Sequence, residues 1–320
     1  MPVQATRLIR KMRGGAQAHL LECDDGHFYV VKFRNNPQHR RILINEWIGS
    51  VFLHYLQIAT PEAAIVNLPA EFLDANPGIH IQLGSRHQAV EPGWHFGSRH
   101  PGDPGKVMVY DFLPDALLDK VVNATEFLGV LAFDKWMSNA DARQSIFFRA
   151  RIRQWQPPEG ESAARAGRDR GAPGATAQAP RAGFVGQAPR AGFVAQAPRA
   201  GFVAQAPRAG FVAQMIDHGY VFDGPHWKFP DSPLQGLYFR PSVYQNVQGF
   251  HDFQPWLDRV VYFPEEVVDA ALKQIPPEWV AEDGEGLHAM LEKLMSRRRR
   301  VPDLIRDSRH GRVNPFPEWK

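Results

Sequence analysis

Apolar and polar positions near the start of the chain predict a β-hairpin. Residues 18–23 and 27–33 are rich in apolar and aromatic side chains, and Asp24-Asp25-Gly26 separates them. An Asp-Gly turn between two such runs is a strong hairpin signal, because these residues adopt the backbone angles of a tight turn. The pattern therefore predicts two paired strands within residues 17–33.

A helical apolar period follows over residues 39–57. Leu43, Trp47 and Val51 recur at intervals of four, and Pro61 ends the pattern. The next apolar runs predict two strands with a long Gly-, Pro- and His-rich loop between them. These strands cover residues 63–68 and 106–112, and the loop covers 84–105.

The later part of the chain is predicted to be mainly helical, which makes the fold class α+β. Its expected elements are a helix at 123–137, a hairpin of strands at 145–149 and 211–217, and helices within 255–300 broken at Pro264 and Pro276-Pro277.

A low-complexity stretch from about 157 to 208 interrupts this pattern. Its nine-residue unit, Ala-Gln-Ala-Pro-Arg-Ala-Gly-Phe-Val, occurs at 177–185, 195–203 and 204–212, and at 186–194 with Gly186 in first place. Pro and Gly in every unit oppose both helices and central strands. We expect a mostly disordered insertion in the loop of the second hairpin. A docking tail that displays the Phe-Val pairs is the functional alternative.

Composition narrows the class of protein. The 320 residues are 44% hydrophobic, which suffices for one large domain or two lobes. The net charge is only +3, and many arginines lie in the low-complexity stretch, which argues against a nucleic-acid binder. Cys23 is the only cysteine, and no apolar run approaches the roughly 18 residues of a membrane helix. We expect a soluble cytoplasmic protein without a membrane partner.

Two charged residues are candidates for holding a phosphate. Lys32 ends an alternating apolar strand, and Glu46 lies 14 residues later on the predicted helix. Kinases hold the phosphates of ATP with such a lysine and aim it with a helix glutamate. A strand-end charge and a solvated helix face are the structural alternatives.

Two further segments are candidates for nucleotide contacts. Gly14, Gly15 and Gln17 lie in a turn where main-chain amides can approach phosphate. Tyr110 and Phe112 lie in an apolar segment that is a candidate for the link between two lobes, whose backbone groups would face adenine. A plain turn and a buried strand are the alternatives.

Two aspartates are candidates for the chemistry itself. Asp141 lies in the polar loop 138–144, and Asp217 follows the second strand of the predicted hairpin. The hairpin would bring both to one end of a sheet. There, one carboxylate can orient or deprotonate an acceptor hydroxyl while the other holds Mg²⁺. His218 is expected to make a structural hydrogen bond.

Taken together, these motifs resemble those of the HipA-like kinases, in the branch of small stand-alone bacterial proteins. The matching segments are Gly14-Gly15-Ala16-Gln17-Ala18-His19, Tyr29-Val30-Val31-Lys32-Phe33, Asn45-Glu46-Trp47, residues 138–144 and Met215-Ile216-Asp217-His218-Gly219. The resemblance implies a two-lobed protein-kinase-like fold, with a strand-rich N-terminal lobe at 1–112 and a mostly helical C-terminal lobe at 113–320. It implies ATP-dependent Ser/Thr phosphorylation, with Lys32 on the ATP phosphates, Asp141 as the catalytic aspartate and Asp217 on Mg²⁺.

The chain departs from the family pattern at one metal ligand. The family loop usually carries an asparagine five residues after the catalytic aspartate, and here Ile146 stands in that position. Gln144 and Ser145 are the candidate substitutes, so the second metal site is open. An antitoxin-type partner is not implied, because the chain has no room for the extra N-terminal subdomain of HipA toxins.

The expected function is therefore an ATP- and Mg²⁺-dependent protein kinase whose acceptor the sequence does not identify. A nucleotide-binding pseudokinase is the first alternative, because of Ile146. A small-molecule kinase and a scaffold that displays the repeats are the others.

Overall fold

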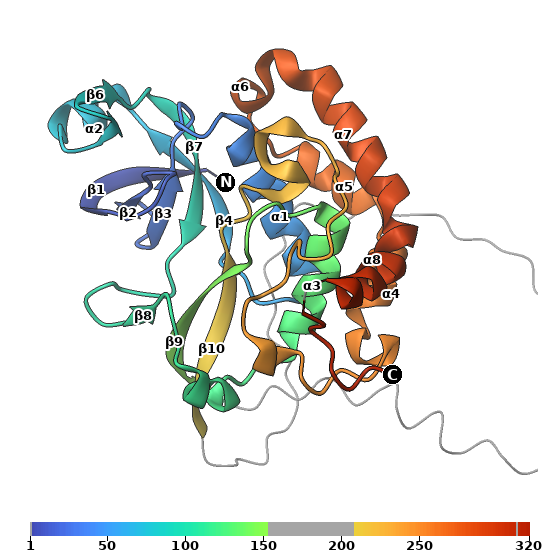
Figure 1. The fold of residues 1–320 in the computed structure, drawn as a ribbon. Coiled ribbons are helices and arrows are strands. Elements are labelled where there is room, and N and C mark those ends of the chain that lie inside the picture. The colour runs from blue at the N-terminus through green and yellow to red at the C-terminus, as the bar shows by residue number, and fades with distance from the viewer. Residues whose placement is uncertain (1, 153–207, 312) are drawn as a thin grey trace, which may run out of the picture. The chain divides into compact units, whose positions relative to one another are not determined.

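The computed structural model describes residues 2–152, 208–311 and 313–320 (Figure 1). Residues 1–150 and 210–320 form one compact unit, and this unit is described below. Most of the predicted low-complexity insertion at 157–208, including its predicted disorder, lies outside the described residues.

The unit combines strands, α-helices and short 3₁₀ turns (Figure 1). The strands are β1 (Val3–Lys11), β2 (His19–Cys23), β3 (Phe28–Lys32), β4 (Ala63–Leu68), β5 (His80–Leu83), β6 (Arg86–Ala89), β7 (Gly93–Arg99), β8 (Val109–Tyr110), β9 (Gln144–Ile152) and β10 (Arg208–Ile216). The α-helices are α1 (Arg41–Tyr55), α2 (Ala70–Ala75), α3 (Glu126–Met137), α4 (Trp256–Val261), α5 (Glu265–Leu272), α6 (Pro277–Val280), α7 (Gly284–Arg297) and α8 (Val301–Asp307). The 3₁₀ helices are η1 (Asp115–Lys120), η2 (Val221–His226), η3 (Pro241–Val243), η4 (Phe250–Phe253), η5 (Ala281–Asp283), η6 (Arg298–Arg300) and η7 (Ser308–His310).

A small closed barrel contains the predicted first hairpin. Its strand order is β1-β2-β3-β7-β4, with β4 returning parallel to β1. In the β2–β3 pair, His19 lies opposite Val31 and Glu22 opposite Phe28, which confirms the hairpin predicted within residues 17–33. The turn contains Gly26 with a φ of 76°, which favours glycine.

The prediction of a long loop at 84–105 is wrong. Strands β6 and β7 lie within it, and β7 pairs with both β3 and β4. A side chain on Gly97 would place its Cβ 2.5 Å from Val66 Cγ2. The glycine therefore serves close packing between strands, and composition alone suggested a loop. The strand predicted at 106–112 is also shorter than expected, because β8 covers only Val109–Tyr110.

The helical predictions are largely confirmed. Helix α1 lies within the predicted 39–57, and α3 lies within 123–137. In the last third, α4 ends before Pro264, and α6 begins at Pro277. The prolines separate these helices because a proline lacks the amide that an interior helical position requires.

Two groups of buried apolar side chains form the core. The smaller group fills the barrel, with Leu21, Val31 and Val66 among its members. The larger group joins α1 to the C-terminal helices, and Phe52 of α1 stacks on Trp136 at 5.4 Å between ring centroids. The predicted lobe boundary at residue 112 stays a prediction. None of the helices within the described residues is both long and apolar enough to cross a membrane.

The second sheet contains the two strands of the other predicted hairpin, while the connection between them lies outside the described residues. Its strand order is β10-β9-β8. Phe211, Ala213 and Met215 of β10 are buried, as expected for a strand with one face on the core. The strand ends at Ile216, so that Asp217 follows it directly.

Helix α1 connects the barrel, this sheet end and the C-terminal helices (Figure 1). Two glycines permit its close approach to the turn after β10. A Cβ on Gly49 would lie 2.7 Å from the Cβ of His218, and a Cβ on Gly219 would lie 2.7 Å from Ile42 Cγ2. Any larger residue at either position must push the helix and the turn apart.

One cation is buried in the C-terminal part. Lys135 of α3 is 1% exposed, and its Nζ donates to the carbonyls of Ser232 at 3.0 Å and Pro233 at 2.9 Å. Burial lowers the pKa of Lys135 to about 8, because Asp134 offsets only part of the desolvation of the ammonium group. The ammonium group thereby fixes the 232–233 backbone.

Replacing Gly49 with alanine is expected to destabilise the protein. Overpacking at such a contact costs about 1–3 kcal/mol in free energy of unfolding, measured by urea denaturation. The matched control is Gly284→Ala, because a Cβ at this helical position has open space around it. That change is expected to alter stability by less than about 1 kcal/mol. Equal effects at both positions would contradict the close packing of α1.

The buried Lys135 predicts a pH dependence of stability. Below pH 8, Lys135 is charged in both the folded and the unfolded protein. The folded protein then bears the full free-energy cost of burying the ammonium group. Between about pH 8 and 10.5 the folded protein releases the proton while the unfolded chain keeps it, so the wild type gains stability relative to Lys135→Met. The expected slope is at most about 1.4 kcal/mol per pH unit. Lys293→Met, at an exposed position, is the control, and parallel profiles for wild type and Lys135→Met would refute the assignment.

Candidate active site

Three charged side chains from distant segments meet at the end of β3. Lys32 is the last residue of β3, Glu46 lies on α1, and Asp217 follows β10. The Nζ of Lys32 forms an ion pair with Glu46 Oε1 and donates to Asp217 Oδ1 at 2.7 Å. The structure thus shows the contact expected between Lys32 and Glu46, and it adds Asp217 to the same ammonium group.

Burial and mutual attraction shift the pKa of each group. Burial favours neutral Lys32, but Glu46 and Asp217 outweigh it and raise the pKa of Lys32 above its ordinary value. Lys32 in turn lowers the pKa of Asp217. Burial raises the pKa of Glu46, whose side chain is only 3% exposed. Asp217 remains 32% exposed, so it is the carboxylate of the pair that faces solvent.

Glu46 also holds the turn after β10. Its Oε2 accepts the main-chain N–H of His218 at 3.1 Å, while Oε1 faces Lys32. Asp217 has a φ of 58°, a left-handed conformation that is uncommon for a residue with a side chain. One glutamate therefore fixes both the lysine and the backbone beside the aspartate.

Asn45, the neighbour of Glu46, holds the segment that follows. Its Nδ2 lies within hydrogen-bonding distance of the carbonyls of Gly219, Val221 and Gly224, at 2.7–3.1 Å. Its Oδ1 accepts the indole N–H of Trp227 at 3.0 Å. This role of Asn45 was not predicted. The signals in the sequence were the polar pair within an apolar helix and the matching family segment Asn45-Glu46-Trp47.

The Asp141 loop lies at the same end of the second sheet as Asp217. Arg143 follows Asp141 closely and donates from Nη1 to the carbonyl of Ile216 at 3.0 Å, immediately before Asp217. Asp141 is half-buried, and its Oδ1 accepts the main-chain N–H of Ala142 at 2.8 Å. The two loops therefore share one end of the sheet, while direct convergence of the carboxylates on a metal stays a prediction.

Of the two predicted metal ligands, Asp217 lies beside Lys32 and Gln144 lies at the start of β9. Gln144 is exposed, and its Nε2 donates to Asp141 Oδ2 at 3.3 Å. Ile146 is 9% exposed on β9 and offers no ligand atom. Over residues 2–152, 208–311 and 313–320, no three His, Cys, Asp or Glu side chains gather in a metal-binding arrangement. Mg²⁺ in kinases needs only one or two carboxylates in addition to phosphate oxygens, so Asp217 suits this mode of binding.

The Gly-rich turn connects β1 and β2. Met12 N–H donates to Ala18 O at 2.8 Å, which closes the loop that contains Gly14 and Gly15. Gly14 has a φ of 119°, so this position favours glycine. The side chain of Gln17 donates to Gln82 O and accepts from Gln82 N, both at 2.7 Å. Gln17 therefore attaches the loop to β5, and its predicted nucleotide contact stays a prediction.

Tyr110 and Phe112 differ in their surroundings. Tyr110 of β8 packs edge-on against Phe211, with ring centroids 6.0 Å apart. Phe112 is 65% exposed, and the Arg240 guanidinium lies 4.7 Å above its ring. Their predicted role beside adenine stays a prediction.

A cavity of about 340 Å³ lies beside Asp141. Its wall includes Asp223, Ser232, Leu234 and Phe239. Hydrogen bonds from α3 and the residue after it hold the segment at 230–235. Ser138 Oγ donates to Pro230 O at 3.0 Å, and Lys135 Nζ donates to the carbonyls of Ser232 and Pro233. The part of the cavity wall formed by residues 230–235 is therefore held in place next to the candidate catalytic loop.

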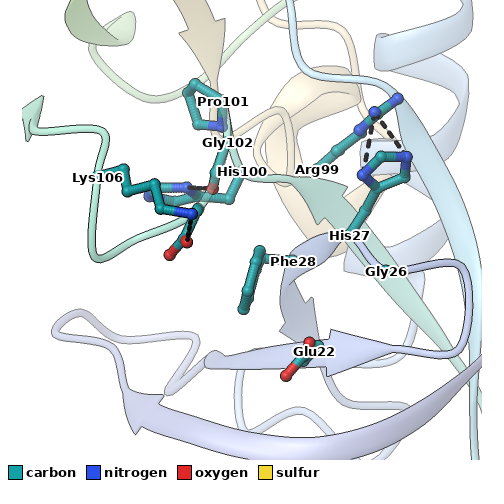
Figure 2. A pocket seen from close by; sticks show the side chains of 10 residues that line it. Glu22, Gly26, His27, Phe28, Arg99, His100, Pro101, Gly102 and Lys106 are labelled. Atoms are coloured by element: carbon teal, nitrogen blue, oxygen red, sulfur yellow. Dashed lines mark hydrogen bonds and ion pairs between the residues drawn. The ribbon is translucent and has the colours of Figure 1, made fainter.

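A second cavity, of about 390 Å³, lies elsewhere, at the rim of the barrel (Figure 2). Arg99 contacts His27 Nε2 at 2.8 Å and pairs with Glu62, and Lys106 pairs with Asp103 at 3.0 Å. None of the predicted site residues lines it. Arg99 and Lys106 are thus already paired with carboxylates, and the candidate active site is the one around Lys32.

A model of the HipA-like kinase family matches residues 5–147. No curated protein matches the sequence significantly.

Two solved structures resemble the fold at a TM-score of 0.42. They are the Golgi casein kinase with Mn/ADP bound, at 10% identity, and the Golgi casein kinase, at 9% identity. The matches cover 97% of this chain in both cases, and 73% and 74% of the respective casein kinase chains.

The family match contains Lys32, Glu46 and Asp141 and ends before Asp217. The geometry connects this last residue to the others, through the hydrogen bond between Lys32 and Asp217. Over residues 5–147 the chain is thus similar to the HipA-like kinase family, and this match supports a phosphotransferase.

Proposed function

We propose that the protein transfers the γ-phosphoryl group of ATP, with Mg²⁺, to a serine or threonine hydroxyl of a protein. The observation that carries this proposal is the shared position of Lys32 between Glu46 and Asp217. A phosphate-binding lysine, its helix glutamate and a metal-binding aspartate are the parts that phosphoryl transfer requires in protein kinases.

Each residue has a role that follows from its surroundings. Glu46 holds Lys32 charged and directs its ammonium group toward the β- and α-phosphates of the nucleotide. Asp217, the more exposed carboxylate, would hold Mg²⁺, and the metal would supply positive charge that neutralises the phosphates. Asp141 orients the acceptor hydroxyl and accepts its proton as the new P–O bond forms. The bond between the γ-phosphorus and the bridging oxygen breaks, and ADP leaves with that oxygen.

The cavity beside Asp141 supports the placement of the acceptor. It has a volume of about 340 Å³, and hydrogen bonds hold the part of its wall at 230–235 in place. An acceptor hydroxyl in this cavity would lie next to the Asp141 carboxylate. The exposed side chains of Leu234 and Phe239 supply apolar contact for the rest of the acceptor.

A nucleotide-binding pseudokinase is the second candidate function. It is favoured by Ile146, which is buried on β9 in the position where the family usually has a metal-binding asparagine. An active kinase would need Gln144 to serve as the second metal ligand in place of that asparagine. Gln144 is hydrogen-bonded to Asp141, so it lies beside the candidate catalytic loop.

Replacing Asp217 with asparagine is expected to abolish phosphoryl transfer. The neutral amide cannot hold Mg²⁺ as a carboxylate does, so transfer from γ-labelled ATP should fall by at least about 100-fold. Asp103→Asn is the control, because Asp103 is a partly exposed aspartate at the other cavity. Undiminished transfer by Asp217→Asn, with the control active, would refute the proposed function.

Thermal denaturation with ATP and Mg²⁺ separates the two candidates. Both a kinase and a pseudokinase are expected to show a higher Tm in the presence of the nucleotide, because ligand binding stabilises the folded state. Lys32→Met should remove the shift. A shift in the wild type without phosphoryl transfer across a panel of acceptors would favour the pseudokinase, and no shift would contradict both.

A further inference from the structure

A buried ion pair lies behind the candidate catalytic loops. Asp134, near the end of α3, and Arg143, just before β9, have fully buried side chains. Arg143 Nε donates to Asp134 Oδ2 at 2.8 Å, and Nη2 pairs with the other carboxylate oxygen. This bidentate geometry fixes the plane of the guanidinium group.

The remaining donor of Arg143 contacts both neighbours of Asp217. Its Nη1 lies 3.0 Å from the carbonyl oxygen of Ile216 and 3.0 Å from Nδ1 of His218. Asp217 itself adopts the left-handed φ of 58°. A backbone in this region needs support from its surroundings, and Arg143 supplies it on both sides of the aspartate.

These contacts assign one tautomer to His218. A guanidinium group only donates, so Nδ1 of His218 must accept and Nε2 must carry the proton. Nε2 then donates to Thr60 Oγ1 at 3.1 Å, and the Thr60 hydroxyl donates to the carbonyl of Met215 at 2.8 Å. Burial, together with Arg143 and Lys32, lowers the pKa of His218 well below its ordinary value, so the ring stays neutral.

The same ion pair reaches the Asp141 loop on its other side. Asn139 Nδ2 donates to Asp134 Oδ1 at 3.0 Å, and Asn139 Oδ1 accepts the N–H of Asp141 at 3.2 Å. A continuous series of hydrogen bonds therefore runs from the Asp141 backbone, through Asn139, Asp134 and Arg143, to the backbone on both sides of Asp217.

We propose that Arg143 is a positioning residue that sets the spacing between the Asp141 loop and Asp217. This rests on the proposed function, because both aspartates must face the same transferring phosphoryl group. Lysine could keep the charge opposite Asp134, but a single ammonium group cannot reproduce the fork that reaches Asp134, Ile216 and His218 together. Misplacement of one loop by about 1 Å is enough to reduce the rate of transfer by about 100-fold.

The test compares Arg143→Lys with Arg41→Lys. Arg41 also pairs bidentately with an aspartate, Asp283, and donates to a main-chain carbonyl, that of Pro225. Arg143→Lys is expected to lower kcat for transfer from ATP by at least about 10-fold. Arg41→Lys should retain kcat within about twofold at a comparable Tm. A normal kcat in Arg143→Lys, or an equal loss in both variants, would overturn the proposal.

A double variant and an NMR measurement test the role of Arg143 independently of whether Arg143→Lys folds. If Arg143→Lys does not fold, the double variant Asp134→Leu with Arg143→Met removes both buried charges together. Folded but slow enzyme supports the proposal, and folded enzyme at the wild-type rate overturns it.

The ¹⁵N resonances of the His218 ring test the contact between Arg143 and His218 without any measurement of activity. At about pH 8, a protonated Nε2 with an unprotonated Nδ1 supports the contact, and the opposite tautomer, with the proton on Nδ1, overturns it. Absence of transfer by the wild type refutes the proposed function instead.

Discussion

The arrangement of this protein depends on how one buried ammonium group is neutralised. Lys32 is almost fully enclosed, and a buried charge without a partner is strongly unfavourable. Glu46 from α1 and Asp217 from the end of β10 supply the compensation, so three segments far apart in the sequence must meet. Asp217 is the partly exposed carboxylate of the two, so a cation from solvent can approach it while Glu46 stays enclosed.

Helix α1 converts this local requirement into a constraint on the larger fold. Its apolar side chains belong to the core that includes the C-terminal helices, while Asn45 and Glu46 hold the backbone from His218 to Gly224. Glycines at the closest approach allow the helix and the turn to touch. The position of Asp217 is thus determined by packing as well as by charge, which a precise catalytic geometry requires.

Sequence patterns predicted the parts of this account that are local. The Asp-Gly turn, the apolar period of α1 and the strand before Asp217 each depend on neighbouring residues, and the structure has them. Strand β7 was missed because Gly97, which signals a loop, is required by Val66 of the adjacent strand. Buried polar partners such as Asn45 and Arg143 contact residues far away in the sequence, so no local pattern reveals them. The hydrogen bond from the Gln17 side chain to Gln82 is another such distant contact, and the nucleotide contact predicted for Gln17 stays a prediction.

A crystal structure with Mg²⁺ and a non-hydrolysable ATP analogue tests the central claim most directly. The account predicts that Lys32 keeps its contact with Glu46 and binds the phosphates, while the Asp217 carboxylate coordinates Mg²⁺ on the same end of the sheet as Asp141. A nucleotide bound away from Lys32, or a metal held without Asp217, would contradict it.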